Sequence, residues 1–497
     1  MDFVEREKIE EIGITLNDSE GNPVTIRQVK DSFDFTHIIT KALKSGGQGL
    51  VCWTDNSEIV VKFALDLKGQ LISRERDKAE FKKNDAKFKS VVYKPFPDRI
   101  RLAHPIACLA DYSGYVMRFM GDMTSFADLV PTTQLGIENM AKDGGHRRRF
   151  LLLSKLAALL TKLHANGMVY CDLSPNNVFV TENYEQNTQN VWLIDADNVF
   201  ILGEDEDNLV YTPRYAAPEL FDRKPCSQNS DIYSFATLAF ETLAALHPFE
   251  GEKATNWTDC GDDWDAESTA PDSTPPAIDP RYSGKYPWVE DTEDDSNHTQ
   301  AGLPRQNFLT DETFALFNMT FSEKGRESPK TRPTVSLWAR AFAHSHALSV
   351  QCPDCKMSFV FDETKKICPW CDQKLPQILL LKDESGKIVF AQELCASDSE
   401  NEFSLPEHIF LLFDIDSFFK STILVRSLNQ EDFGLELKLG QDRSNKMDFF
   451  ICINGNEEKI VNRYILQLKN GENYSLVCKD SKSGKNRELK IVLTEET

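Results

Sequence analysis

The stretch 167-GMVYCDLSPNNVFV-180 decides how the rest of this 497-residue chain is interpreted. It places Asp172 five positions ahead of Asn177, between an apolar approach and an apolar exit. An Asp can orient an attacking hydroxyl group and accept its proton, and an Asn side-chain oxygen can ligate Mg²⁺. Because an Asp/Asn pair by itself is more often a capped turn, the flanking segments must decide between the two interpretations.

A second carboxylate follows at the end of an apolar strand. In 191-VWLIDADNV-199 the run VWLI points to Asp195 as a further metal ligand, with Asp197 as the alternative. Phosphoryl transfer depends mostly on positioning and charge neutralisation, and it asks little covalent chemistry of the protein. Asp172, Asn177 and Asp195 together therefore fit a phosphoryl-transfer site.

A glycine-rich segment and a strand lysine come earlier in the chain. In 43-LKSGGQGLV-51 the glycines let backbone N–H groups approach phosphates closely, although a simple hairpin turn is the alternative. Lys62 follows Gly49 by thirteen residues, on an apolar strand, where a cation can grip nucleotide phosphates. A carboxylate on the following helix would hold this lysine in place. Glu80 has the better spacing and Glu75 is the alternative.

Composition bounds the class of protein. A formal net charge of −22 argues against a general binder of nucleic acid or of acidic membranes, which needs a positive surface. The chain starts with charged residues and shows no secretory signal. Its most apolar stretch, 150–163, is interrupted by Lys155 and Lys162, short of the roughly 18 apolar residues of a membrane span. We expect a cytoplasmic protein of two to four domains.

Two close cysteine pairs predict a metal site. In 352-CPDCKMSFVFDETKKICPWC-371, Cys352 and Cys355 precede Cys368 and Cys371 by twelve residues, the spacing of two zinc knuckles. Four thiolates form a closed tetrahedral site, so the Zn²⁺ would be structural. A redox dithiol pair is disfavoured because both pairs are matched and lie in strand-like sequence. The other cysteines are scattered, which indicates a reducing compartment.

Helical periodicity is visible in three segments. The apolar pattern of 147–167 ends at Gly167, a favourable residue for a helix C-cap, and 230–246 predicts a helix with Ser230 as N-cap. The charged stretch 68–88 also has helical character.

Two further segments have no helical pattern. Residues 251–306 predict a long irregular acidic insertion. Residues 376–497 alternate like strands, with turn signals at ESGK, INGN, KNGE and KSGK, and predict a β-sandwich of about seven strands. Its apolar run 409–419 is expected in the core.

Taken in order, residues 37–347 resemble a eukaryotic-type (Hanks-type) protein kinase. Ala217, Pro218 and Glu219 match the end of a kinase activation segment, and Arg332 matches the arginine that pairs with this Glu. Asp231 matches the helix Asp that braces the catalytic loop. These marks separate protein kinases from small-molecule kinases.

The resemblance implies ATP and Mg²⁺ (or Mn²⁺) as cofactors. Thr212 matches the threonine that Ser/Thr kinases place beside the catalytic Asp, and Met117 matches the gatekeeper of the adenine-binding hinge. The implied catalytic residues are Lys62, Asp172, Asn177 and Asp195, with Asn177 and Asp195 holding the metal. The implied nucleotide-binding residues are Ser45, Gly46, Gly47, Gln48, Gly49, Val51, Lys62, Glu80, Met117, Phe119 and Met120.

The chain departs from the family pattern around Asp172. Tyr170 and Cys171 replace His and Arg, which makes this a non-RD kinase, and Ser174 replaces a lysine that steadies the transferring phosphate. The acidic run 204–207 would repel an added phosphate, so we expect no requirement for activation-loop phosphorylation. Lys62 and both catalytic Asp residues are retained. An active kinase is therefore expected, with a nucleotide-binding pseudokinase scaffold as the alternative.

A narrower resemblance rests on GGQG, IDAD, HPFEG and LFNMTF, which are similar to bacterial signalling kinases of tellurite-resistance-type and stress gene clusters, often with a C-terminal zinc ribbon. The expected fold is multidomain α+β: a bilobal kinase fold, a small zinc ribbon, and an all-β domain. The expected partners are protein substrates and a protein bound at the β domain, with neither nucleic acid nor membrane. The expected domains are an extension at 1–36, the kinase at 37–347, the ribbon at 348–375 and the β domain at 376–497.

Overall fold

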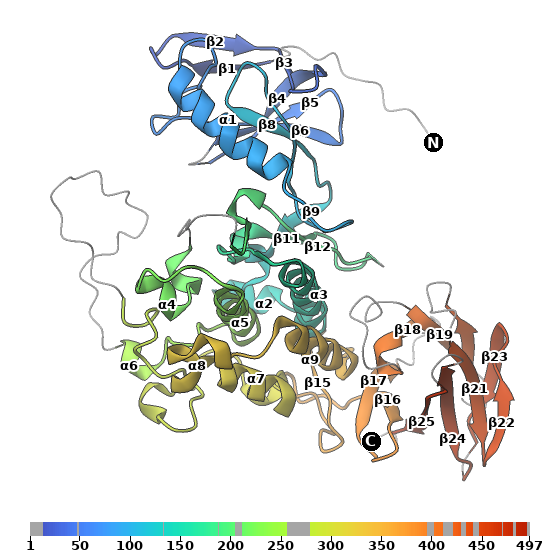
Figure 1. Ribbon diagram of the computed structural model, residues 1–497. Helices are drawn as coiled ribbons and strands as arrows, with labels where there is room; N and C mark the ends of the chain where they lie inside the picture. Colours follow the sequence, from blue (N-terminus) through green and yellow to red (C-terminus); the bar gives the residue numbers. More distant parts are fainter. Residues whose placement is uncertain are drawn as a thin grey trace.

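The computed structural model shows two lobes, a small ribbon and a β-sandwich (Figure 1). The N-terminal lobe, in blue, lies above a helical lobe in green and yellow, and the sandwich, in orange and red, lies beside the helical lobe. The structure describes residues 13–46, 49–132, 134–186, 188–203, 211–255, 279–394, 402–410, 421–428, 434–440, 447–469, 471–480 and 484–494.

The N-terminal lobe is a six-stranded sheet in the order β3-β4-β5-β6-β8-β7, with α1 against it. Along β6 the side chains alternate between the two faces. Val61 and Phe63 enter the lobe core, so Lys62 faces the opposite side. The elements are β1 (Ile14–Asn17), β2 (Pro23–Ile26), β3 (Gln28–Lys30), β4 (Thr36–Gly46), β5 (Gly49–Thr54), β6 (Ile59–Phe63), α1 (Lys78–Val92), β7 (Pro105–Cys108) and β8 (Gly114–Arg118).

Two expectations change in this lobe. Ile14, Ile26 and Val29 belong to the same buried cluster as β4 and β5, so in the described residues the segment before residue 37 is part of the lobe. The helix expected over 68–88 begins only at Lys78.

The helical lobe is built around α3, α5, α7 and α9, which share one large apolar core. Phe150 of α3 and Phe342 of α9 are fully buried and stack at 6.3 Å between ring centroids. The elements are β9 (Met123–Ser125), α2 (Gln134–Asn139), α3 (Gly145–Ala165), β10 (Met168–Val169), β11 (Val178–Thr181), β12 (Val191–Leu193), β13 (Phe200–Ile201), α4 (Pro218–Phe221), α5 (Gln228–Ala244), α6 (Glu252–Thr255), α7 (Asp311–Phe321), α8 (Glu323–Glu327) and α9 (Val335–Ala347).

The helix ends follow local capping rules, with one correction. Gly167 has φ +70° just after the end of α3, where a residue with a Cβ would be strained. The expected N-cap Ser230 is wrong: Ser227 caps α5, and Ser230 is its partner three residues on in a capping box. Both serines lie near the start of the same apolar pattern, but the helix begins directly after the first of them, Ser227.

The described half of the insertion, residues 279–306, is irregular but packed. Trp288 is fully buried against Phe240 of α5 and Phe321 of α7, and Asn297 is buried with its amide donating to two backbone carbonyls. This half therefore forms one wall of the helical lobe.

The ribbon consists of β14 (Ser349–Gln351) and β15 (Ser358–Val360), with the cysteine knuckles at their ends. The β domain that follows is a sandwich of a six-stranded sheet, β17-β16-β25-β24-β21-β22, and a four-stranded sheet, β18-β19-β20-β23. Its strands are β16 (Gln377–Lys382), β17 (Ile388–Leu394), β18 (Glu402–Pro406), β19 (Ser421–Leu428), β20 (Gly434–Leu439), β21 (Met447–Ile453), β22 (Asn456–Lys459), β23 (Arg463–Gln467), β24 (Tyr474–Asp480) and β25 (Asn486–Leu493).

The sandwich core bears on two expectations. The described sheets hold six and four strands, more than the seven or so expected. Of the apolar run 409–419, Ile409 and Phe410 are buried in the sandwich core, as expected, and residues 411–419 lie outside the described residues.

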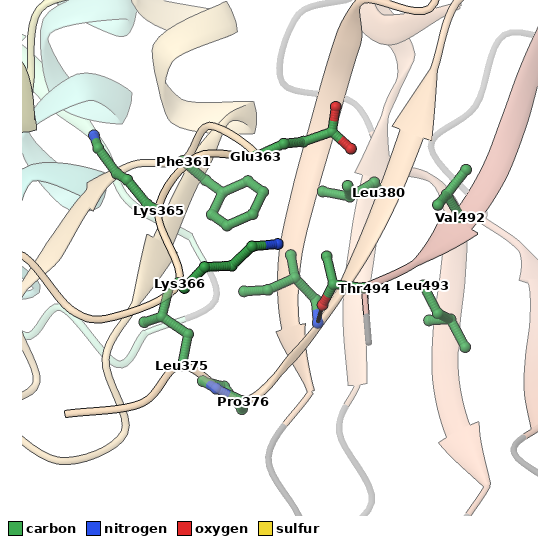
Figure 2. Close-up of a pocket in the computed structure, with 11 residues that line it drawn as sticks. Phe361, Glu363, Lys365, Lys366, Leu375, Pro376, Leu380, Val492, Leu493 and Thr494 are labelled. Atoms are coloured by element: carbon green, nitrogen blue, oxygen red, sulfur yellow. Dashed lines mark hydrogen bonds between the residues drawn. The ribbon is translucent and has the colours of Figure 1, made fainter. Parts of the chain in front are cut away.

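A pocket of about 200 Å³ that is open to solvent lies between the ribbon and the sandwich (Figure 2). Phe361 and Leu375 line it from the ribbon, and Leu380 and Val492 line it from the six-stranded sheet. The Lys366 side chain extends over it toward the sandwich. The pocket thus has an apolar floor and a charged rim.

In the part of the chain that the structure describes, no helix combines the length and the apolar character needed to span a membrane.

Candidate active site

Asp172 lies in the loop between β10 and β11, and two side chains fix its carboxylate. Thr212 Oγ1 donates to one oxygen at 2.8 Å, and Asn177 Nδ2 donates to the other at 3.1 Å. Asn177 Nδ2 also donates to the Asp172 backbone carbonyl at 2.9 Å. The carboxylate is partly exposed and held in one orientation, as a general base for a hydroxyl group must be.

The backbone ahead of Asp172 is braced by the fully buried Asp231 of α5. Its carboxylate accepts the backbone N–H groups of Tyr170 and Cys171, both at 2.8 Å, and contacts His164 Nε2 at 2.9 Å. Cys171 is held at φ +73°, an unfavourable conformation for a residue with a Cβ, and such strain persists only where neighbours impose it. The bracing that the sequence implied for Asp231 is confirmed.

Asn177 and Asp195 are brought together by the β11–β12 hairpin. Val178 pairs with Leu193, and the N–H of Ile194 donates to the Asn177 carbonyl at 3.0 Å, so both side chains emerge at the same end of the hairpin. Because Asn177 Nδ2 donates to Asp172, its amide oxygen is the atom left for a cation. An amide oxygen beside a carboxylate is a donor set that suits Mg²⁺. Asp195 adopts φ +53°, again a strained conformation at this site.

Lys62 joins the two lobes at this point. Its Nζ lies 3.3 Å from Asp195 Oδ1 and 5.6 Å from the Tyr115 ring centroid. Glu80 lies in the first turn of α1 and Glu75 precedes the helix, and both are exposed. A carboxylate partner from α1 therefore stays a prediction, whereas the Lys62–Asp195 contact is a pairing that the sequence did not reveal.

The glycine-rich segment forms the β4–β5 hairpin. Gly46 pairs with Gly49, and Gly47 and Gln48 lie outside the described residues. Gly49 has φ +153°, and a Cβ there would come within 2.3 Å of the Phe63 carbonyl oxygen. The glycine is thus required for the close approach of β5 to β6, whatever it contributes to phosphate binding.

The expected hinge follows β8. Met117 pairs with Val60 across the sheet, and Phe119 packs on Trp53 at 4.0 Å between ring centroids. Phe119 N–H donates to the Glu58 carbonyl, which anchors the start of the segment containing Met120. The role of these residues in holding adenine stays a prediction.

The end of the activation segment is locked by a buried ion pair. Glu219 and Arg332 make two parallel contacts of 2.8 Å, and Ser230 Oγ donates to the same carboxylate. Both charged groups are buried, so each compensates the charge of the other, and removing one would leave the other unpaired. The pairing implied by the resemblance is confirmed.

The three residues that depart from the family pattern, Tyr170, Cys171 and Ser174, are all buried. Tyr170 is fully buried, and its hydroxyl donates to the Ile194 carbonyl at 2.5 Å, directly before Asp195. The Cys171 thiol is buried and hydrogen-bonds to the thiol of Cys226, and that bond together with burial raises the pKa of Cys226. Ser174 is buried as well. Sequence reasoning missed Cys226, because nothing in the chain links it to Cys171 before folding.

The four ribbon cysteines converge on one point. Cys352 Sγ lies 3.7 Å from Cys371 Sγ, Cys355 Sγ lies 3.7 Å from Cys368 Sγ, and all four sulfurs fall within 4.8 Å of one another. A tetrahedron with zinc–sulfur bonds of about 2.3 Å has sulfurs about 3.8 Å apart, so the thiolates fit Zn²⁺. The separations are too long for disulfides.

The ribbon packs on the first turn of α3. The His146 ring stacks between Phe308 and Trp370, at 5.1 and 5.8 Å between ring centroids. Arg147 makes two contacts of 2.7 Å with Glu393 of β17 and donates to the Ser349 carbonyl. One helix end thus contacts both the ribbon and the sandwich.

Comparison with known proteins agrees with this geometry. Residues 137–278 match the protein kinase domain family. The chain is 25% identical over 226 residues to serine/threonine-protein kinase pkn2 of Myxococcus xanthus, covering 44% of this chain and 25% of that protein. It is 33% identical over 98 residues to inhibitor of nuclear factor kappa-B kinase subunit alpha of Xenopus laevis, covering 20% of this chain and 13% of that protein. It is 33% identical over 104 residues to ribosomal protein S6 kinase alpha-2 of Mus musculus, covering 20% of this chain and 13% of that protein. The chain therefore spans a quarter or less of the length of these relatives.

Proposed function

We propose that this chain, which carries a eukaryotic-type protein kinase domain, transfers the terminal phosphoryl group of ATP to Ser or Thr hydroxyl groups of protein substrates. The observation that carries the proposal is the fixed carboxylate of Asp172, held by Asn177 and Thr212. A hydroxyl donor placed beside a catalytic base limits the space for the acceptor, which favours the short Ser and Thr side chains over Tyr.

Each residue has one part in the reaction. Asp172 accepts the proton of the acceptor hydroxyl. The hydroxyl oxygen forms a bond to the terminal phosphorus of ATP, and the bond between that phosphorus and the ADP oxygen breaks. Lys62 supplies positive charge to the phosphates from the N-terminal lobe. Asn177 and Asp195 would hold Mg²⁺, which neutralises phosphate charge when bound.

The test compares the wild-type chain with Asp172→Ala and Asp195→Asn in radiolabelled ATP with Mg²⁺ or Mn²⁺. Wild type is expected to label itself or acceptor proteins, and both variants are expected to lose at least a hundredfold in rate, because the base or the metal ligand is absent. Equal label in all three proteins would reject the catalytic assignment. ATP binding without transfer by the wild type would instead favour a nucleotide-binding scaffold.

The kinase is further proposed to work without activation-loop phosphorylation. The arginine that would pair with a phosphate is replaced by Cys171, whose thiol is buried against Cys226. The Thr212 hydroxyl donates directly to the Asp172 carboxylate. If phosphatase treatment abolished activity and phosphorylation of Tyr211 or Thr212 restored it, this part of the proposal would be rejected.

The C-terminal modules are assigned supporting roles. The four ribbon thiolates would hold a structural Zn²⁺, which their separations support. The β-sandwich would recruit a substrate or another protein partner in the cytoplasm, as its position after the kinase suggests. Unchanged substrate phosphorylation in cells after removal of residues 376–497 would count against the recruiting role.

A further inference from the structure

The segment that follows Thr212 is held by a cluster of charged and aromatic side chains centred on Arg214. Arg214 lies in the short 3₁₀ helix Pro213–Tyr215, directly after the residue that contacts Asp172. Its side chain is one-third exposed, and all three guanidinium nitrogens donate hydrogen bonds. A planar fork with this many partners fixes a backbone segment more firmly than a single point charge does.

The first partner comes from α5. Arg214 Nε and Nη2 donate to Glu241 Oε1 at 3.0 and 2.6 Å, and the hydroxyl of the neighbouring Tyr215 donates to Glu241 Oε2 at 2.6 Å. Glu241 is buried in the apolar core of the helical lobe. A buried carboxylate whose donors are removed is left without hydrogen-bond partners, so displacing Arg214 or Tyr215 is costly.

The other partners come from the insertion and from the turn that leads into it. Arg214 Nη1 donates to Glu250 Oε1 at 2.5 Å and contacts the Tyr282 hydroxyl at 2.7 Å, and that hydroxyl donates to Glu250 Oε1 at 2.7 Å. Although burial acts to raise the pKa of Glu250, the charge that His247 gains in acid, the Arg214 guanidinium and the Tyr282 hydrogen bond lower it to about 2. The carboxylate is therefore charged at neutral pH.

Two backbone contacts extend this attachment. His247 Nε2 donates to the Arg214 carbonyl at 2.9 Å, and its ring meets Tyr282 edge-on at 5.0 Å. Further along, the backbone of Gly284 packs so closely on Pro218 that a Cβ on the glycine would come within 2.6 Å of the proline ring. The insertion thus contacts the segment 213–218 near both of its ends, at Arg214 and at Pro218.

We propose that Arg214 is a positioning residue that ties the acceptor-binding segment 211–218 to α5 and to the insertion, in the place of a phosphorylated activation segment. This rests on the proposed function. This clamp, formed by Arg214 with Glu241, Glu250 and Tyr282, keeps Thr212 against Asp172 and so presents the acceptor hydroxyl to the base. The nucleotide site on the other side of Asp172 does not depend on the clamp. The role of the insertion is then to supply Tyr282 and the turn around Gly284.

The test measures phosphate transfer to myelin basic protein, to dephosphorylated casein and to the chain itself, after phosphatase treatment. Arg214→Ala is expected to lower acceptor kcat/KM by about ten- to a hundredfold, because misplacement of the acceptor costs rate steeply. Arg214→Lys is expected to recover little of this loss, since an ammonium group cannot bind two carboxylates in a fork. The affinity for a fluorescent ATP analogue should stay within about twofold of wild type.

Two more variants serve as a milder test and as a control. Tyr282→Phe keeps the ring and removes one hydroxyl, so a loss of about fivefold is expected even if Arg214→Ala fails to fold. Lys224→Ala removes an exposed cation that pairs with the exposed Asp222, and it should leave transfer unchanged.

The outcomes separate the two proposals. If Arg214→Ala or Tyr282→Phe keeps the wild-type kcat/KM for the acceptor, the clamp proposal is rejected and the kinase assignment is unaffected. A fall in ATP affinity equal to the fall in acceptor transfer also overturns it, because the residue would then be merely structural. No transfer by the wild-type chain overturns the proposed function and the clamp with it.

Discussion

Tyr170 and Cys171 make contacts that their family counterparts, His and Arg, would not make in this fold. The Tyr170 hydroxyl reaches the Ile194 carbonyl and so anchors the backbone that carries Asp195. Cys171 sits in a buried space shared with Cys226 that accommodates a thiol, but not a solvated cation. At the residue scale, both substitutions are explained by burial.

The Tyr170→Phe variant tests the hydroxyl. Its free energy of unfolding is expected to be about 1 kcal/mol lower than that of the wild type, because one buried hydrogen bond is lost while the ring still fills its site. A several-fold loss of transfer should accompany this, since the Asp195 strand end loses an anchor. Denaturant unfolding and radiolabel transfer measure the two effects. An unchanged unfolding midpoint would show that the hydrogen bond contributes nothing.

The Cys171→Arg variant, which restores the family residue, should be strongly destabilising. A guanidinium would enter a buried site where Cys226 offers no negative charge, at a cost of about 3 kcal/mol or more. Cys171→Ala is the matched control and should cost about 1 kcal/mol. Thermal unfolding of the two proteins gives the comparison. Equal stability of the arginine and alanine variants would reject a closed surrounding for this position.

At the scale of elements, local rules predicted much of what the structure contains. The INGN signal becomes a tight turn between β21 and β22, with Asn454 at φ +49° and Gly455 at φ +89°, as a two-residue hairpin requires. One boundary failed because two equivalent residues compete, Ser227 and Ser230 at the start of α5. Turn and cap chemistry is local, so the sequence carries it.

His247 gives the α5–insertion junction a pH dependence. Burial lowers the pKa of His247 to about 4 from 6.5. The ring is neutral because Nδ1 accepts the Phe249 N–H and Nε2 donates to the Arg214 carbonyl, among the charges of Arg214, Glu241 and Glu250. The unfolded chain binds this proton first, so acid favours unfolding. This contribution to stability is complete above pH 6.5 and is lost as the pH falls toward 4.

Urea unfolding between pH 7 and pH 4 measures this contribution. His247→Gln should flatten the pH dependence by on the order of 3 kcal/mol across that window, since Gln cannot take up a proton. His298→Gln changes a more exposed histidine and serves as the control. Identical pH profiles for wild type and His247→Gln would refute the assignment.

At the scale of the whole molecule, the ribbon packs against the core of the helical lobe. Trp370 and Met357 pack against the same apolar cluster as α3 and α9, and Arg147 joins α3 to Glu393 of the sandwich. The last turn of α3 leads directly to the catalytic loop. The three modules therefore meet at one helix.

If the four ribbon thiolates hold a metal as proposed, its loss should weaken the helical lobe. Cys355→Ser, or exposure to a zinc chelator, is expected to lower the thermal midpoint of the helical lobe by several degrees, because Trp370 and Met357 lose their support. Cys452→Ser changes a thiol in the sandwich that is outside the cluster and should have little effect. Calorimetry with metal analysis measures both quantities. A stoichiometric zinc content with no change in the lobe on removal would show that the ribbon is independent.

The sequence by itself determined the order of the proposed phosphoryl-transfer residues, the two cysteine knuckles, the turn positions and the β character of the C-terminal domain. These features depend on short spacings and on the conformational preferences of single residues. Only the tertiary structure decided that Lys62 contacts Asp195, that Cys171 meets Cys226, that Arg214 is clamped by the insertion and that the ribbon packs on α3. Each of these pairs joins residues far apart in the chain, and their proximity results from burying apolar surface, which is not directional and leaves no local pattern to detect.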